Sequence, residues 1–201
     1  SYFGEGATRL ATVTVRDVTE RERLRMERKL LEDAKSAAEA AAATDFLTGL
    51  SNRRQLMSLC TSLFANAKRN AQPIAVAVLD IDNFKKVNDT FGHDAGDTVL
   101  KALASQLKER FRATDIVARL GGEEFCVVAA NLDKAAAKKL FEGFRKHLAD
   151  FPMDVGGEQL HITISIGVTT ALTDNVESMI AAADALLYQA KHQGRNCVVM
   201  V

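Results

Sequence analysis

Two acidic residues stand where carboxylates could share a cation. Asp80 and Asp82 follow the apolar run at 74–79, and the alternation of a strand places both on one side while Ile81 points to the other. Neighbouring carboxylates repel each other unless a cation lies beside them, and Mg²⁺ prefers such oxygen ligands together with substrate phosphates. Taken alone, the pair fits a solvated strand end equally well.

A second acidic pair follows a predicted turn. Glu123 and Glu124 come directly after two consecutive glycines, which suit a tight hairpin turn between strands predicted at 116–120 and 125–130. If this hairpin lies beside the strand that ends at Asp80, three or four carboxylates converge. Such a cluster requires metal ions, and metal ions beside a nucleotide indicate phosphoryl or nucleotidyl transfer.

The composition narrows the class of protein. The 201 residues include 26 basic and 26 acidic ones, so the formal net charge is zero, which argues against a nucleic-acid polymer as partner. Neither a membrane-spanning apolar run nor a secretory leader is present. Cys60, Cys126 and Cys197 lack metal-binding spacing, which favours reduced thiols in a cytoplasmic protein. The chain begins at Ser1 rather than Met, so we expect a fragment whose parent could be membrane-anchored upstream.

The chain divides into three predicted segments. Residues 1–17 contain a short strand pattern and are expected to be the end of an upstream sensory domain. Residues 18–43 are rich in helix formers, with apolar residues at a heptad-like spacing, which favours a coiled-coil-type dimerising helix over a solvated one. Residues 44–201 read as one α/β domain, with helices expected near 51–70, 94–112, 134–148 and 176–192, and further strands at 73–79, 161–169 and 197–201.

Five ordered blocks of residues 44–201 resemble the GGDEF family of diguanylate cyclases, here in the spelling GGEEF. They are DFLTGLSNRR at 45–54, DIDNFKKVND at 80–89, FGHDAGD at 91–97, RLGGEEF at 119–125, and YQAK with GRN within 188–196. The resemblance implies a palm-like mixed central β-sheet surrounded by α-helices. It also implies a transferase of signal transduction, in which a homodimer condenses two GTP into cyclic di-GMP and two pyrophosphates.

The same resemblance implies roles for the acidic residues. Asp80, the backbone carbonyl of Ile81 and Glu123 would coordinate Mg²⁺, for which Mn²⁺ could substitute. Glu124 would orient or deprotonate the attacking 3′-hydroxyl, or join the metal ligands. Because positioning and electrostatics supply most of the catalysis of such reactions, Glu123 is expected to matter more for rate than for binding.

Other matching positions imply contacts to GTP. Asn88 and Asp97 correspond to the family's guanine-binding residues, although without the family a helix cap and a helix-start charge explain them better. Lys191 and Arg195 correspond to triphosphate-binding residues, and their spacing of four predicts one shared face at the end of the last helix. Two cations near a helix C-terminus would also suit the helix dipole.

Three further residues complete the predicted substrate site. Phe84 and Lys85 belong to it because backbone amides at a helix start could hold phosphates. His93 is included as a motif residue, although structural hydrogen bonding is its plainer interpretation.

Regulation is implied at two places. Arg112 and Asp115 form an Arg-x-x-Asp pattern five residues before the hairpin, where the family has its product-inhibition site, so we expect feedback inhibition by cyclic di-GMP. Residues 15–21 resemble the end of a PAS-type sensory domain.

Two alternatives to a cyclase are a catalytically silent receptor of cyclic di-GMP and a bare dimerisation module.

Overall fold

The computed structural model describes residues 21–34, 43–173 and 175–201 and divides the chain into two units, 1–42 and 43–201. In the first unit, residues 21–34 form an α-helix whose side chains are all exposed. This agrees with part of the helix expected at 18–43, whereas the strand pattern within 1–17, the PAS-like segment at 15–20 and residues 35–42 lie outside the described residues. In the described parts of the chain, no helix is long and apolar enough to cross a membrane.

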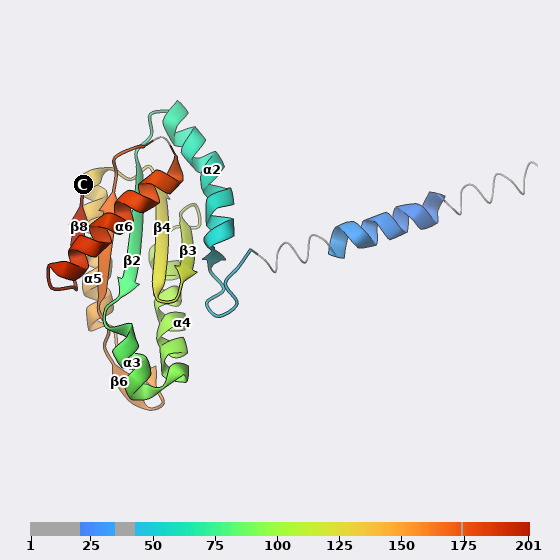
Figure 1. Ribbon diagram of the computed structural model, residues 1–201. Helices are drawn as coiled ribbons and strands as arrows, with labels where there is room; N and C mark the ends of the chain where they lie inside the picture. The colour runs from blue at the N-terminus through green and yellow to red at the C-terminus, as the bar shows by residue number, and fades with distance from the viewer. Residues whose placement is uncertain (1–20, 35–42, 174) are drawn as a thin grey trace, which may run out of the picture. The chain divides into compact units, whose positions relative to one another are not determined.

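The second unit is built on a mixed six-stranded sheet in the order β1-β3-β4-β2-β7-β8 (Figure 1). Its inner pairs are antiparallel, whereas β1 pairs with β3 and β7 with β8 in parallel. A separate hairpin is formed by β5 and β6. The elements in chain order are β1 (Ser51–Asn52), α2 (Arg53–Arg69), β2 (Ile74–Ile81), α3 (Phe84–Phe91), α4 (His93–Arg110), β3 (Ile116–Gly121), β4 (Glu124–Ala130), α5 (Lys134–Asp150), β5 (Met153–Val155), β6 (Glu158–Leu160), β7 (Ile164–Thr169), α6 (Val176–His192) and β8 (Val198–Met200).

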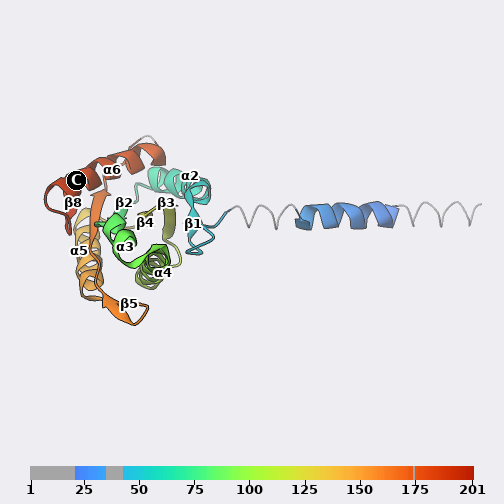
Figure 2. The ribbon, with the colours of Figure 1, turned by 60° about the horizontal axis from the view of Figure 1, so that its bottom comes forward.

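Helices cover both faces of the sheet, as Figure 2 shows, with α2 and α6 on one face and α4 and α5 on the other. Central strand β2 is buried along its whole length, which explains its unbroken apolar sequence. Val76 and Val78 pack on the α2–α6 side, whereas Leu79 and Ile81 pack on the α4–α5 side. By this alternation Asp80 belongs to the side that α2 and α6 cover.

The functional end of the sheet is where β2 ends and the β3–β4 hairpin turns. Strands β2 and β4 are antiparallel neighbours, and Asp80 is paired in register with Glu124. The turn passes through Gly122 with φ of +51°, a conformation that glycine adopts without steric cost. The predicted adjacency of the strand that ends at Asp80 and the hairpin that carries Glu124 is therefore confirmed.

Helix α3 follows β2 beyond the strand end, and α4 then runs back along the face of the sheet, so that the two helices form a hairpin (Figure 1). The chain reverses between them at Gly92, which has φ of +85°. The mixed α/β class and the central sheet agree with the expectation from sequence.

Candidate functional site

Asp80 is the most buried charged residue of the site, with 3% of its surface exposed. Its Oδ2 lies 2.7 Å from Nζ of Lys191 on α6. Burial raises the pKa of the Asp80 carboxyl to about 6; the ion pair with Lys191 opposes this rise, while the charges of Glu123 and Glu124 add to it. The strand end is therefore a place where negative charge accumulates and a cation is favoured.

Asp82 has a different role from Asp80. Its carboxylate accepts hydrogen bonds from the hydroxyls of Thr163 and Ser165 at 2.7 and 2.6 Å, and from the backbone N–H of Asn196 at 2.9 Å. A buried carboxylate with three donors is a satisfied structural group. Asp82 does lie on the predicted side of the strand, but it connects β2 to β7 and to the segment after α6.

The hairpin that carries Glu123 and Glu124 is fixed by an arginine. Arg119 on β3 donates from Nε and Nη2 to the backbone carbonyl of Gly122, at 2.9 and 2.7 Å. Gly122 immediately precedes Glu123, and Glu124 begins β4. The guanidinium therefore determines the direction in which the turn presents the first glutamate.

Asp45 holds the other side of this guanidinium. Nη1 of Arg119 donates to both carboxylate oxygens of Asp45, at 3.0 and 3.2 Å, and the backbone and hydroxyl of Thr48 donate to Oδ1. Burial opposes ionisation of Asp45, but these hydrogen bonds and the Arg119 charge outweigh it, so the pKa of Asp45 lies below its ordinary value. Asp45 and Arg119 belong to the motif blocks at 45–54 and 119–125, so the motifs alone could have marked both residues as important. The motifs do not show that the two side chains contact each other across 74 residues of sequence.

The two predicted guanine-binding residues lie on the α3–α4 hairpin. Asn88 is half-buried on α3, and Asp97 is exposed near the start of α4. Between them Gly96 is buried, and a Cβ built on it would lie 1.9 Å from Oδ1 of Asn88. The carboxamide of Asn88 thus occupies the space that any larger residue at 96 would fill.

The predicted phosphate contacts need one correction. Helix α6 ends at His192, so Arg195 does not share a helical face with Lys191; it lies in the following loop with φ of +66°. The side chain of Phe84 is buried in the hydrophobic core, so this residue can contribute to a substrate site only through its backbone. Lys85 in the first turn of α3 and His93 at the start of α4 are exposed, as a substrate contact requires.

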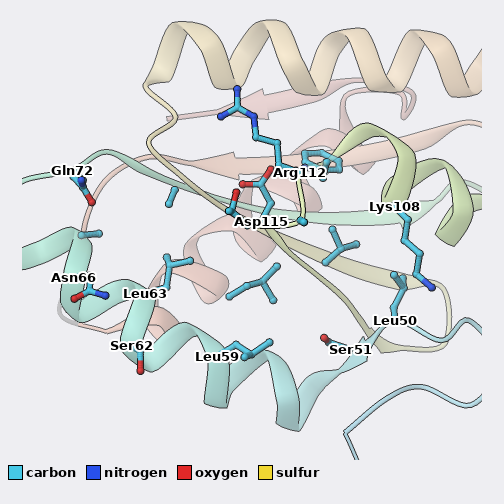
Figure 3. Close-up of a pocket in the computed structure, with 17 residues that line it drawn as sticks. Leu50, Ser51, Leu59, Ser62, Leu63, Asn66, Gln72, Lys108, Arg112 and Asp115 are labelled. Atoms are coloured by element: carbon cyan, nitrogen blue, oxygen red, sulfur yellow. Dashed lines mark hydrogen bonds between the residues drawn. The ribbon is translucent and has the colours of Figure 1, made fainter.

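Arg112 and Asp115 lie at the opposite end of β3 from the hairpin turn. They form a compact turn, in which the N–H of Arg112 donates to Oδ2 of Asp115 at 3.0 Å and the N–H of Asp115 donates to the Arg112 carbonyl at 2.9 Å. Figure 3 shows them across from Leu59 and Leu63 of α2, lining a cavity of about 820 Å³. This volume lies within the range of small-molecule binding sites.

The donor set at the strand end suits Mg²⁺ only in part. Within the described residues, no three acidic, histidine or cysteine side chains are grouped closely enough to hold an ion. Asp80 and the adjacent hairpin glutamates supply hard oxygen ligands, and the ammonium of Lys191 now supplies the neutralising charge. Because Mg²⁺ commonly binds through one or two carboxylates plus substrate phosphates, the residues fit an ion that arrives with a nucleotide.

Comparison with known proteins decides the family. Residues 42–197 match the family model described as diguanylate cyclase, GGDEF domain. The chain belongs to this family. Response regulator PleD of Caulobacter vibrioides is 45% identical over 162 residues, which are 79% of this chain and 36% of PleD. The chain therefore spans about a third of the length of that GGDEF protein.

Solved GGDEF structures have the same fold. The GGDEF domain of DgcB from Caulobacter crescentus, solved in complex with c-di-GMP, is 33% identical with a TM-score of 0.75, and the match covers 79% of this chain and 95% of that one. The coiled coil and GGDEF domain of DgcB, also with c-di-GMP, is 30% identical with a TM-score of 0.77 over 96% of this chain and 99% of that one. These likenesses support the sheet and helices described above.

Proposed function

We propose that this chain is a diguanylate cyclase, which condenses two GTP into cyclic di-GMP and two pyrophosphates. The observation that carries the proposal is the pairing of Asp80 with Glu124 in register, with Lys191 against Asp80. Three acidic residues and a lysine at one strand end suit a polyphosphate that binds with a cation. An enzyme that consumes GTP would act in the cytoplasm.

Some of the site residues would bind GTP, and others would hold the metal ion or take part in the reaction. Asn88 and Asp97 would contact guanine, Lys191 and Arg195 the triphosphate. Asp80, the carbonyl of Ile81 and Glu123 would hold Mg²⁺. When bound, Mg²⁺ would neutralise charge on the phosphate oxygens. Glu124 would orient the 3′-hydroxyl and accept its proton as that oxygen attacks the α-phosphorus of the facing GTP.

The reaction requires a dimer, because each chain would hold one GTP. Each 3′-hydroxyl forms a new P–O bond to the α-phosphorus of the other nucleotide, and the bond to pyrophosphate breaks. The exposed helix at 21–34 would support this arrangement by pairing with a second copy, under the control of an upstream sensor.

The cavity at Arg112 and Asp115 supports feedback by the product. A guanidinium can pair with a phosphate or stack on guanine, and a carboxylate can accept guanine's N–H donors. The same cavity favours the second candidate function, a silent cyclic di-GMP receptor. Added cyclic di-GMP should lower the initial rate of the wild type but not of an Arg112→Ala variant; a rate unaffected by product contradicts feedback.

Product analysis with a matched pair of variants tests the cyclase against the receptor. The wild type with GTP and Mg²⁺ should yield cyclic di-GMP, and Glu123→Gln should lower the rate by about a hundredfold or more, because transition-state charge stabilisation is lost. Glu158→Gln, an exposed change on β6, should leave the rate unchanged. Binding of cyclic di-GMP without any synthesis would instead establish the receptor.

A further inference from the structure

Arg195 and Asn196 form a strained segment between α6 and β8. Both have positive φ, +66° and +45°. Asn tolerates this left-handed conformation better than other non-glycine residues, whereas Arg rarely adopts it. Two such residues in succession persist only where surrounding contacts hold them, and strain of this kind is common at functional sites.

The backbone of this segment is attached to the end of β2. The N–H of Asn196 donates to Oδ2 of Asp82 at 2.9 Å, and Asp82 is itself held by Thr163 and Ser165. Only 6% of the Asp82 surface is exposed. A buried hydrogen bond that closes a network of three donors on one carboxyl group is costly to break, so this contact fixes the backbone directly after Arg195.

The side chain of Asn196 is held from the opposite side by α5. Nη1 of Arg145 donates to Oδ1 of Asn196 at 2.7 Å. Arg145 is itself oriented by Glu142, whose Oε2 lies 3.1 Å from Nε of Arg145. Asn196 is therefore held at its backbone by β2 and at its side chain by α5.

Both predicted phosphate-binding cations are in this way connected to one strand end. Lys191 contacts Asp80 directly, and Arg195 precedes the residue that contacts Asp82. We propose that Asn196 is a positioning residue, which with Arg145 and Asp82 holds Arg195 in the left-handed conformation and so aims its guanidinium at the triphosphate of GTP. This inference rests on the proposed function, because it deepens the account of that substrate site.

A positioning role differs from a purely structural one in what it predicts. If Asn196 acts through Arg195, its replacement weakens nucleotide binding only while Arg195 is present. If it merely stabilises the fold, the effect on binding is the same with or without Arg195. A double-mutant cycle on nucleotide affinity separates the two.

The experiment measures binding of 3′-deoxy-GTP with Mg²⁺ by calorimetry, because this nucleotide lacks the attacking hydroxyl. Asn196→Ala should weaken binding by about tenfold, the lower end of the scale for one lost charge-assisted hydrogen bond. In an Arg195→Ala background the same change should have no further effect. Asn196→Asp keeps an acceptor for Arg145 and should bind within about twofold of the wild type.

Glu158→Gln, an exposed change on β6 outside this chain of contacts, is the control, and its affinity should equal that of the wild type. Should Asn196→Ala fail to fold, as judged by thermal unfolding, Arg145→Met tests the same contact. Wild-type affinity in Asn196→Ala, or equal losses in both backgrounds, overturns the positioning role.

Synthesis of cyclic di-GMP by the wild type is measured in parallel. The absence of synthesis refutes the proposed function alone, whereas a wild type that binds no 3′-deoxy-GTP refutes both proposals.

Discussion

At the scale of single residues, Arg119 shows how the acidic hairpin is held in place. Its guanidinium binds the carbonyl that precedes Glu123 and, on its other side, the carboxylate of Asp45. Lysine could not make these contacts at once, because an ammonium lacks the planar fork of donors. The orientation of Glu123 therefore depends on a residue at the start of the domain.

Removal of the Asp45 charge should lower stability in a pH-dependent way. The pKa of Asp45 is depressed in the folded state, so its stabilising contribution is present above the unfolded pKa near 3.8 and disappears as pH falls through the folded value. Asp45→Asn should cost about 1–3 kcal/mol at pH 7. Urea unfolding of both proteins from pH 7 to pH 3 should show this difference shrinking toward acid; a difference that grows toward acid contradicts the ion-pair account.

Gly96 gives a second prediction at this scale. In Gly96→Ala the new methyl group would displace the carboxamide of Asn88, because the added Cβ would lie only 1.9 Å from Oδ1 of Asn88. We expect the KM for GTP to rise about tenfold, as for the loss of one or two hydrogen bonds to the base. Gly143→Ala on α5, whose methyl would meet only the end of the Arg110 side chain, is the control in the same assay. An unchanged KM would show that Asn88 does not read guanine from its present position.

At the scale of elements, the backbones of β7 and α6 approach each other closely at Gly167. A Cβ on Gly167 would lie 2.0 Å from the carbonyl oxygen of Ala183 and 2.2 Å from the backbone nitrogen of Leu187. Backbone atoms cannot rotate away as a side chain can. Helix α6, which carries Lys191, can therefore pack this close to β7 only because residue 167 is a glycine.

Gly167→Ala should accordingly destabilise the domain by about 3 kcal/mol, the upper part of the range for overpacked cores. Chemical denaturation measures the change. Gly143→Ala is again the matched control and should be neutral or slightly stabilising, since alanine favours a helix over glycine. A Gly167→Ala protein as stable as the wild type would show that β7 and α6 are packed more loosely than described.

The long elements could be predicted from sequence because their patterns are periodic. The apolar run of β2, the turn with two glycines and α6 at 176–192 lie where expected, although β7 begins at Ile164 rather than at 161. The two-residue β1 and the eight-residue α3 carry too few positions for a period to show. For α3 the sequence predicts that a helix begins near residues 83–85, but it does not predict where this helix ends.

The site was predictable where it depends on motifs and not where it depends on tertiary contacts. The register of Asp80 with Glu124 follows from adjacent antiparallel strands. Arg195 has a positive φ, which contradicts its local preference: its own N–H donates to the Ala190 carbonyl of α6, and the next residue, Asn196, is held by β2 and α5. The expectation of a helical face shared with Lys191 is therefore wrong. Likewise, the hydroxyls that saturate Asp82 come from residues more than 80 positions away.

At the scale of the whole molecule, each chain provides half of the proposed reaction. The described helix at 21–34 exposes Leu24, Leu30 and Leu31 by 61–74% of their surfaces, which a second copy could cover. The stripe is short, however, and isolated helices of this length are only marginally stable in water. We expect weak self-association, in the micromolar range or above; sedimentation that shows a nanomolar dimer contradicts this expectation.

The most direct test of the account is the initial rate of cyclic di-GMP formation from GTP and Mg²⁺ as the chain concentration is varied. Because two GTP-loaded chains must meet, a logarithmic plot of rate against concentration should have a slope near two at low concentration and near one once dimers are saturated. We expect that curve for the wild type and a rate at least about a hundredfold lower for Glu123→Gln at every concentration. No cyclic di-GMP from the wild type at the highest concentration would contradict the central claim.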